Sequence, residues 1–263
     1  MAAPTRARVA EACARWLWVP EGATLVETDD WTLVRYPAWA YTPLAMPVFR
    51  PAGDPGAALD EALAEARRLA DGVDAVEATV GIDAPDGVAA LFEARGGELA
   101  EETDVLAVDL SDGVPDLGPL DAAVTCRWVV TPDDARAHND VAVEVFDSPR
   151  ADDERIAQMA RRGAEQATHG RGGFVLALLD GEPVGSSGLE VAGTDARLYG
   201  GAVREQARGR GVYRALLRHR LAHAVEHGAT LGLTKGRVAT SGPILRRAGF
   251  EAFGRETTYR LPL

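Results

Sequence analysis

The amino-acid sequence predicts an α/β fold with two domains, on two observations. First, segments with the alternation of strands and segments with the spacing of helices follow one another along all 263 residues. Second, the polar, turn-rich segment 111–119 separates two stretches of different charge. Residues 1–118 carry 8 Lys and Arg against 22 Asp and Glu, a net charge of −14, whereas residues 119–263 carry 20 against 18, a net charge of +2. We therefore expect one domain over residues 1–118 and another over residues 119–263.

The first half is predicted to alternate helices and strands. Val19-Pro20 stops the first helix, Asp29-Asp30 marks the turn of a hairpin, and Asp71-Gly72 ends the second helix. The predicted elements are a helix over residues 5–18, strands over 24–27 and 31–36, a helix over 57–70, a strand over 75–80, a helix over 84–94 and a strand over 105–108.

The second half restarts with a strand and two helices. Thr131 is a helix N-cap followed by Pro132 at the first helical position, and Asp180-Gly181 is a strong hairpin signal. The predicted elements are a strand over 124–130, a helix that starts at 131–134, a helix over about 151–168, strands over 173–179, 183–191 and 196–203, a helix over 212–227, a strand around 231–233, a helix over 241–248, and two short strands over 250–253 and 257–261.

A glycine-rich segment, Gln206-Ala207-Arg208-Gly209-Arg210-Gly211, lies between a predicted strand and a predicted helix. The glycines let the backbone approach a ligand, and the helix start leaves N–H groups without partners at the positive end of the helix dipole. That arrangement suits a phosphate or pyrophosphate; the alternative is an ordinary surface turn. A P-loop would need Gly-Lys-Ser/Thr, but the only lysine is Lys235. A dinucleotide fingerprint would need glycine in place of Arg214.

The spacing Gln-x-x-Gly-x-Gly, after Val203 and before an amphipathic helix, resembles the pyrophosphate loop of the GCN5-related N-acetyltransferases (GNAT). A second landmark, Leu245 to Glu251, is similar to that family's helix ending in a Gly-Phe corner, where Gly249 would cap the helix. The order of elements over about residues 122–263 is also that of the family. The resemblance implies the GNAT fold, a mixed, mostly antiparallel sheet flanked by helices.

An internal repeat supports two related domains. Ala248-Gly249-Phe250-Glu251 echoes Arg95-Gly96-Gly97-Glu98, and similar elements precede each copy. The first half has no equivalent of the glycine loop, because its helix begins at Pro55-Gly56-Ala57. We interpret residues 1–118 as a degenerate acetyltransferase-like domain that binds no cofactor; the alternative is a chance match between two helix corners.

The resemblance implies that acetyl-coenzyme A is the cosubstrate. Guanidinium groups match phosphate oxygens, which fits the two arginines of the loop. Tyr213 either touches the cofactor or packs in the core. The expected cofactor-binding residues are Gly201, Ala202 and Val203 along the pantetheine arm and acetyl carbonyl, and Arg208, Gly209, Arg210, Gly211, Val212 and Tyr213 around the pyrophosphate.

The chain departs from the family at the two positions where catalytic residues are expected. Acetyl transfer needs a neutral amine, a polarised carbonyl and a proton for the departing thiolate. The family often has a glutamate base where Arg197 stands and a tyrosine acid where Leu245 stands. The remaining candidates are Tyr199, which even spacing places on the same strand face as Val203, and Glu190 on the neighbouring strand. Each is also consistent with a structural role, and water is an alternative proton carrier.

The resemblance places the acceptor site at the junction of the first two helices, at Phe146 and Asp147. Acidic groups there favour a cationic amine, although acids at a helix start also suit its dipole. His219, His223 and His227 share one helix face. We expect no metal there, because Arg218 and Arg220 flank the first histidine and would repel a cation.

Composition excludes several classes of function. The acidic charge argues against a nucleic-acid partner, and no apolar run is long enough to span a membrane. Two isolated cysteines and no apolar signal core favour a cytoplasmic protein. We expect an acyltransferase that moves acetyl from acetyl-coenzyme A to the amine of a small, cationic acceptor. The alternative is a non-catalytic acyl-coenzyme A-binding regulator or sensor.

Overall fold

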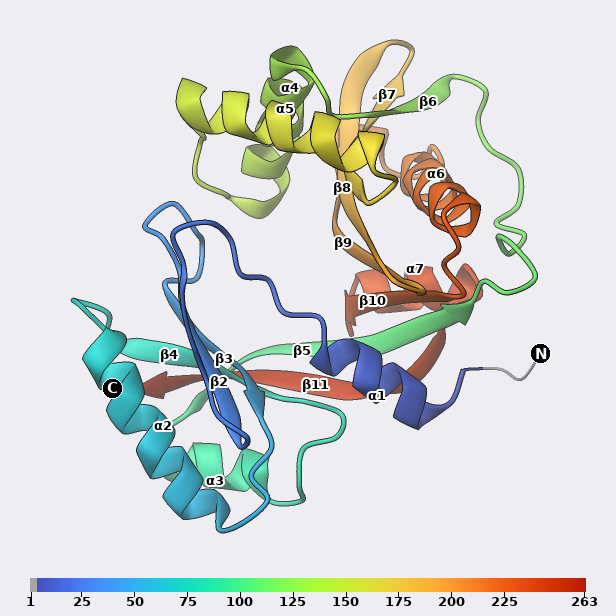
Figure 1. Ribbon diagram of the computed structural model, residues 1–263. Helices are drawn as coiled ribbons and strands as arrows, with labels where there is room; N and C mark the ends of the chain where they lie inside the picture. Colours follow the sequence, from blue (N-terminus) through green and yellow to red (C-terminus); the bar gives the residue numbers. More distant parts are fainter. Residues whose placement is uncertain (1–3) are drawn as a thin grey trace. The chain divides into compact units, whose positions relative to one another are not determined.

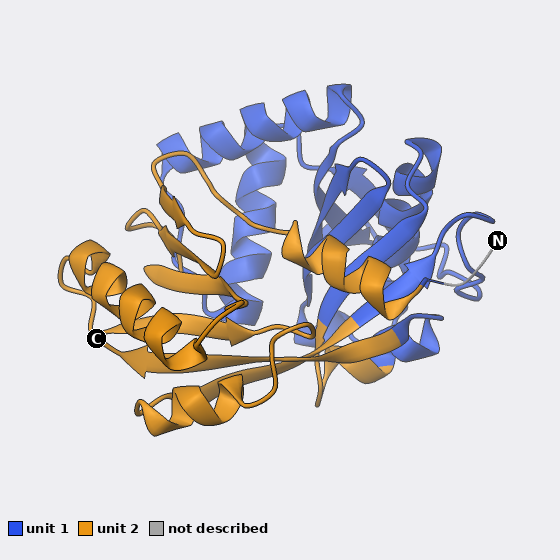
Figure 2. Cartoon of the chain, turned by 60° about the horizontal axis from the view of Figure 1, so that its bottom comes forward, with its two compact units in different colours: residues 1–4, 106–235, 244–251 blue, residues 5–105, 236–243, 252–263 orange. Residues whose placement is uncertain are grey.

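Figure 1 shows a computed structural model of the chain, which describes residues 4–263. The chain forms two compact units, coloured separately in Figure 2. Unit 1 contains Pro4 and residues 106–235 and 244–251; unit 2 contains residues 5–105, 236–243 and 252–263. The two units therefore interleave along the chain and do not meet at the single boundary expected after residue 118.

Unit 1 contains a sheet with helices on both faces. Helices α4 and α5 pack on one face of β7, β8 and β9, and α6 packs on the other (Figure 1). The strand order is β5-β10-β9-β8-β7-β6, in which β9 and β10 are parallel and β6 to β9 are antiparallel. The elements are β5 (Glu98–Asp109), β6 (Val124–Trp128), α4 (Pro132–Phe146), α5 (Asp153–Thr168), β7 (Gly172–Leu179), β8 (Glu182–Ala192), β9 (Asp195–Val203), η1 (Glu205–Ala207), α6 (Val212–Glu226), β10 (Leu231–Arg237) and α7 (Ser241–Arg247). The first part of β5, the end of β10 and the start of α7 belong to unit 2.

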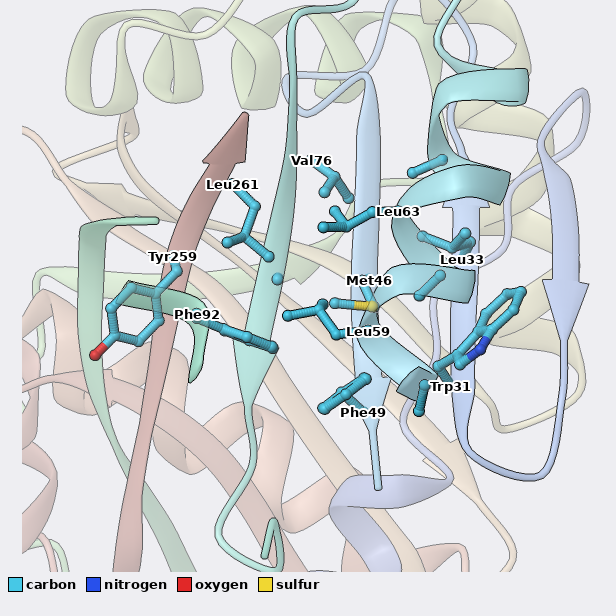
Figure 3. Close-up of a cluster of buried hydrophobic side chains, with 14 of the residues drawn as sticks. Trp31, Leu33, Met46, Phe49, Leu59, Leu63, Val76, Phe92, Tyr259 and Leu261 are labelled. Carbon is cyan, nitrogen blue, oxygen red and sulfur yellow. The ribbon is translucent and has the colours of Figure 1, made fainter. Parts of the chain in front are cut away.

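Unit 2 has the strand order β1-β2-β3-β4-β11-β5, with β3 and β4 parallel. Figure 3 shows its core, where Phe92 lies between Phe49 and Tyr259 with ring centroids 5.4 and 5.9 Å away. The elements are α1 (Arg6–Ala14), β1 (Thr24–Glu27), β2 (Trp31–Arg35), β3 (Leu44–Phe49), α2 (Pro55–Leu69), β4 (Ala75–Val80), α3 (Val88–Ala94) and β11 (Glu251–Pro262), with the first part of β5.

The interleaving comes from two strands. Strand β11 pairs with β4 from Thr257 opposite Val80 to Pro262 opposite Ala75, and its Tyr259 and Leu261 point into the unit 2 core (Figure 3). Strand β5 begins in unit 2 and ends in unit 1, where its Leu106 and Val108 pack in a core cluster. Each half of the sequence thus completes the unit that is built mainly from the other half.

The predicted fold class is confirmed, with some differences in the elements. The Asp180-Gly181 turn has φ values of 51° and 87°, the signs that a type I′ hairpin requires. The two short strands expected at the C-terminus form one strand, β11, in which Gly254 has a φ of 157°. Among residues 4–263, no helix has the length and apolar character needed to cross a membrane.

Candidate functional site

The glycine loop forms the turn between β9 and α6, as predicted. Gly209 and Gly211 have φ values of 77° and 78°, a left-handed conformation that favours glycine. Gly211 is the N-cap of α6 and makes no side-chain cap. The first N–H groups of α6 therefore lack the intrahelical acceptors that later residues have, and they lie at the positive end of a 15-residue helix. This is an anion-binding geometry.

Strand β9 has an open edge next to the loop. It pairs in parallel with β10 only from Asp195 opposite Leu231 to Leu198 opposite Thr234, although β9 continues to Val203. We call residues 199–203 the open edge of β9. At about 3.3 Å per residue this edge extends about 13 Å along the strand and ends at the loop. Its backbone groups on the side of β10 are not used in that pairing.

A β-bulge in the open edge corrects one prediction. Gly188 pairs with Tyr199 and Ser186 with Ala202, so β9 contains one extra residue opposite β8. Gly200, with a φ of 59°, lies in this bulge. The extra residue reverses the side-chain alternation, so Tyr199 faces α4 and α5, whereas Val203 packs in the cluster on the α6 face. The expectation that these two side chains share a face is therefore wrong.

The two catalytic candidates, Tyr199 and Glu190, do lie on the same face of the sheet. Glu190 is opposite Arg197 in the ladder and forms an ion pair with it, with Oε2 3.3 Å from Nη1. Burial raises the pKa of Tyr199 to about 12, and the charge of Glu190 acts in the same direction. Tyr199 is thus a neutral phenol at physiological pH, and the Glu190 carboxylate is tied to a guanidinium.

A buried polar pair lies on the same face. His138 of α4 and Ser186 of β8 are 8% and 1% exposed, and a hydrogen bond of 2.5 Å joins Nδ1 to Oγ. The imidazole also stacks on Phe174, with centroids 4.1 Å apart. Ser186 is opposite Ala202 of the open edge. Burial lowers the pKa of His138 to about 4, so its imidazole is neutral at neutral pH.

The low pKa of His138 predicts acid sensitivity. The folded pKa of about 4 lies below the unfolded value of about 6.5, so the unfolded state binds the proton first as the pH falls. The contribution to stability is full above pH 6.5, decreases by about 2 kcal/mol at pH 5, and decreases by about 3 kcal/mol below pH 4. Urea unfolding of His138→Gln between pH 7 and pH 4 should show a shallower decrease than the wild type. Equal slopes would contradict the assignment.

The loop arginines are held by main-chain and acidic partners. Arg208 Nε donates to the carbonyl of Val203 at 3.4 Å. Arg210 Nη2 donates to Asp121 at 3.1 Å, and that carboxylate also accepts from the N–H of Ala123 at 3.0 Å. These bonds, the backbone one first, lower the pKa of Asp121. Both guanidinium groups therefore lie beside the loop.

The corresponding helix of unit 2 lacks the anion geometry. Helix α2 also follows a strand that pairs in parallel, but its N-cap is Asp54, whose carboxylate accepts from the N–H of Gly56 at 2.9 Å. Pro55 at the first position has no N–H to offer. A fixed negative charge thus occupies the start of α2, and the interpretation of this domain as one without a cofactor stays a prediction.

The junction of α4 and α5 places the acceptor candidates at a helix end. Phe146 is the last residue of α4 and is 39% exposed, and Asp147 follows in the left-handed region with a φ of 54°. The neighbouring acids already have partners, because Asp152 caps α5 and Asp153 lies 2.9 Å from Arg136. Phe146 and Asp147 as acceptor contacts stay a prediction.

Two of the three histidines, His219 and His223 of α6, pack against an aromatic ring, and His227 is the C-cap of that helix. Trp128 lies 5.1 Å from His219 and 4.6 Å from His223, measured between ring centroids. His223, Glu226 and His227 offer ligand atoms within 4.8 Å of one another. One nitrogen of each of these two histidines is already bonded, to the carbonyls of Gly170 and His223 respectively. The expectation that no metal binds here stays a prediction.

Sequence reasoning missed the buried side chain of Arg220. It lies on α6, four residues after Leu216 and one before Leu221, both fully buried. Its guanidinium is 2% exposed and donates to the carbonyls of Gly188 and Tyr199, at 3.0 and 3.5 Å. The helical spacing from Leu216 was a signal that could have placed this arginine on the buried face.

Comparisons with known proteins agree with this geometry. Residues 136–241 match the model of the acetyltransferase (GNAT) family. A GCN5-related N-acetyltransferase from Kribbella flavida is 20% identical over 98% of this chain and 96% of its own, with a TM-score of 0.72. One from Sphaerobacter thermophilus is 22% identical over 95% and 84%, with a TM-score of 0.64. A tandem GNAT protein of the clavulanic acid biosynthesis pathway is 21% identical over 97% and 87%, with a TM-score of 0.62. No curated protein matches.

Proposed function

Since residues 136–241 belong to the acetyltransferase (GNAT) family and the chain has the fold of tandem GNAT proteins, we propose that unit 1 transfers an acetyl group from acetyl-coenzyme A to the amine of a small, cationic acceptor. Acyl transfer is the general activity of the family. The identity of the acyl group, the acceptor and the cytoplasmic setting are parts of the proposal.

One observation carries the proposal: the open edge of β9 leads directly into the uncapped start of α6. Coenzyme A joins an extended, amide-containing arm to a diphosphate, and a strand edge followed by an anion site complements those two parts in that order. The backbone of Gly201, Ala202 and Val203 would hold the arm. The N–H groups from Gly209 to Tyr213 would hold the diphosphate, aided by Arg208 and Arg210.

The acceptor would approach on the face of α4 and α5. This face carries Tyr199, Glu190 and the His138–Ser186 pair. The amine must be neutral before it attacks, and Ser186 or water would carry its proton away. Asp147 at the end of α4 would attract a cationic acceptor. Backbone N–H groups of the open edge would polarise the thioester carbonyl.

The alternative, a non-catalytic acyl-coenzyme A sensor, is favoured by the state of the acid–base candidates. Glu190 is paired with Arg197, and the pKa of Tyr199 is raised to about 12. Tyr199 therefore keeps its proton at neutral pH, and the Glu190 carboxylate is shared with a guanidinium. A sensor would keep the cofactor site and lack turnover, so binding and turnover must be measured separately.

The test begins with cofactor binding and proceeds to turnover. Coenzyme A at 100 times its dissociation constant stabilises the protein by about 2.7 kcal/mol, which should raise its Tm by about 6 °C in a saturable way. Thiol release from acetyl-coenzyme A, screened against mono-, di- and polyamines and amino sugars, should then show one dependent acceptor class. Binding without release across the screen would support the sensor. Absence of a Tm shift would refute both.

A further inference from the structure

The C-terminal end of α6 brings three side chains with metal-binding atoms together. His223 lies in the last turn of the helix, Glu226 is its last residue, and His227 is its C-cap. Spacings of three and four residues place the three side chains on one side of the helix. They offer one ligand atom each, and these atoms all lie within 4.8 Å of one another. Two imidazole nitrogens with one carboxylate oxygen are a ligand set that Zn²⁺ accepts.

The two imidazoles of this group lie side by side. Their ring centroids are 4.1 Å apart, and the ring planes differ by 31°. Burial lowers the pKa of His223, and among the described residues the charges that act on it are those of His227 and Glu226. His223 is therefore neutral at neutral pH, the form in which an imidazole binds a metal ion.

A backbone carbonyl already holds one nitrogen of each imidazole. Nε2 of His223 lies 3.2 Å from the carbonyl oxygen of Gly170, and Nδ1 of His227 lies 2.8 Å from the carbonyl oxygen of His223. Because a carbonyl only accepts, both of these nitrogens carry the ring proton, and the lone pairs remain on Nδ1 of His223 and Nε2 of His227. Histidines that bind a metal ion almost always have such an outer partner, which fixes the tautomer and the ring orientation.

Packing fixes the positions of the same two rings. Trp128, the last residue of β6, packs against His223 with the ring centroids 4.6 Å apart. His227 lies against Gly170 in the turn between α5 and β7, since a Cβ atom built on that glycine would be 2.0 Å from Cδ2 of the imidazole. Both rings are thus ordered before an ion arrives, which reduces the entropy lost on binding.

The charges at this end of the helix favour a cation. The C-terminus is the negative end of the helix dipole, and Glu226 adds a carboxylate. Our expectation that no metal binds the histidines depended on Arg218 and Arg220, which flank His219. The guanidinium of Arg220 is buried against carbonyls of β8 and β9, and Arg218 lies about 140° around the helix from His223. That expectation therefore applies to His219 and not to the end of α6.

From this geometry we propose that His223, Glu226 and His227 bind a divalent transition-metal ion of the Zn²⁺ class. Three protein ligands leave the fourth tetrahedral position to water. Glu226 and His227 are exposed, so the ion can enter from solvent. The ion would join the last turn of α6 to its C-cap and would stabilise unit 1 at this end of the helix. The proposal is independent of acyl transfer and stands even if the proposed function fails.

The first experiment titrates Zn²⁺ into the full chain, prepared without an affinity tag, by calorimetry. We expect one ion per chain. Loss of an outer partner alone typically weakens metal binding by about 10- to 100-fold, so Glu226→Gln and His227→Gln, which each remove a ligand, should weaken it by about 100-fold. Mg²⁺, which prefers oxygen ligands, should not compete. The absence of Zn²⁺ binding, or an equal affinity for Mg²⁺, would overturn the proposal.

Two other histidines provide matched controls. His169 is exposed and has its Nδ1 on a backbone carbonyl at 2.8 Å, as His227 has, but it is not part of the group at the end of α6. His219 lies one turn before His223 on the same helix. His169→Gln and His219→Gln should keep the wild-type affinity for Zn²⁺. The proposal is wrong if either control loses that affinity, or if both Glu226→Gln and His227→Gln keep it.

The second experiment distinguishes the proposed site from an ion bound elsewhere on the surface. Zn²⁺ at 100 times its wild-type dissociation constant should raise the Tm of the wild type by about 6 °C and that of His227→Gln by about 1 °C. Long-range ¹H–¹⁵N NMR should show that Zn²⁺ moves the ring nitrogen resonances of His223 and His227 and leaves those of His138 and His169 in place. An unchanged Tm, or shifts at other histidines in place of these two, would reject the site.

Discussion

Replacing Gly211 with valine is expected to weaken coenzyme A binding by at least about 100-fold. Gly211 has a φ of 78° and is the N-cap of α6. A β-branched residue strongly disfavours that conformation, so the loop must change its path. The diphosphate would lose about two charge-assisted hydrogen bonds to backbone N–H groups, worth about 3 kcal/mol together, and each 1.4 kcal/mol corresponds to a factor of ten. Isothermal titration with coenzyme A measures the effect.

The matched control is Gly228→Val at the other end of the same helix. Gly228 has a φ of 83°, and no atom lies within 4 Å of a Cβ built there or at Gly211. Valine therefore imposes a similar backbone cost at both ends of α6, but only Gly211 faces the proposed diphosphate. Wild-type affinity in Gly228→Val with lost affinity in Gly211→Val is the expected result. Comparable affinities in the two variants would remove the loop from the cofactor site.

The loop was predictable from sequence because its determinants are local. A strand, two glycines and a helix start predict a tight turn into a helix, and glycine at positions 209 and 211 permits the positive φ values found there. The same reasoning explains why the hairpin at Asp180-Gly181 was confirmed. Such features need no knowledge of distant residues.

The prediction that Tyr199 and Val203 share a strand face was wrong because of a local irregularity in β9. Even spacing assumes an unbroken strand, and the bulge at Gly200 reverses the alternation after Tyr199. The glycine pair Gly200-Gly201 inside a predicted strand is a sequence signal that a bulge can occur there. Whether a glycine pair in a strand produces a bulge depends on the neighbouring strand, here β8, which single-sequence periodicity does not include.

The remaining features depend on contacts between residues far apart in the chain. His138 meets Ser186 across 48 positions, and Arg220 reaches Gly188 across 32. The pairing of β11 with β4 in unit 2 joins the C-terminus to residues 75–80. A boundary drawn along the sequence could not anticipate that pairing, because local periodicity does not report which distant strand a segment joins.

Replacing Gly163 with alanine is expected to destabilise the protein by about 3 kcal/mol. Gly163 lies inside α5, where alanine would ordinarily gain about 1 kcal/mol of helix propensity. Here a Cβ atom would lie 2.0 Å from the carbonyl oxygen of Val129, a backbone atom at the end of β6 that cannot rotate away. Helix α5 must move off the sheet, and overpacking of this severity outweighs the gain in propensity. Thermal unfolding should show a Tm lower by about 8 °C.

Gly56→Ala in α2 is the control for this effect. The nearest atom to its Cβ is the carboxylate oxygen of Asp54 at 3.3 Å, the end of a flexible side chain, so the change in stability should stay within about 0.5 kcal/mol. The same steric clash should also lower turnover. Helix α5 packs beside α4, which carries His138, so a displacement of α5 in Gly163→Ala should displace α4 as well. A Gly163→Ala protein as stable as wild type would mean that α5 does not rest on Val129.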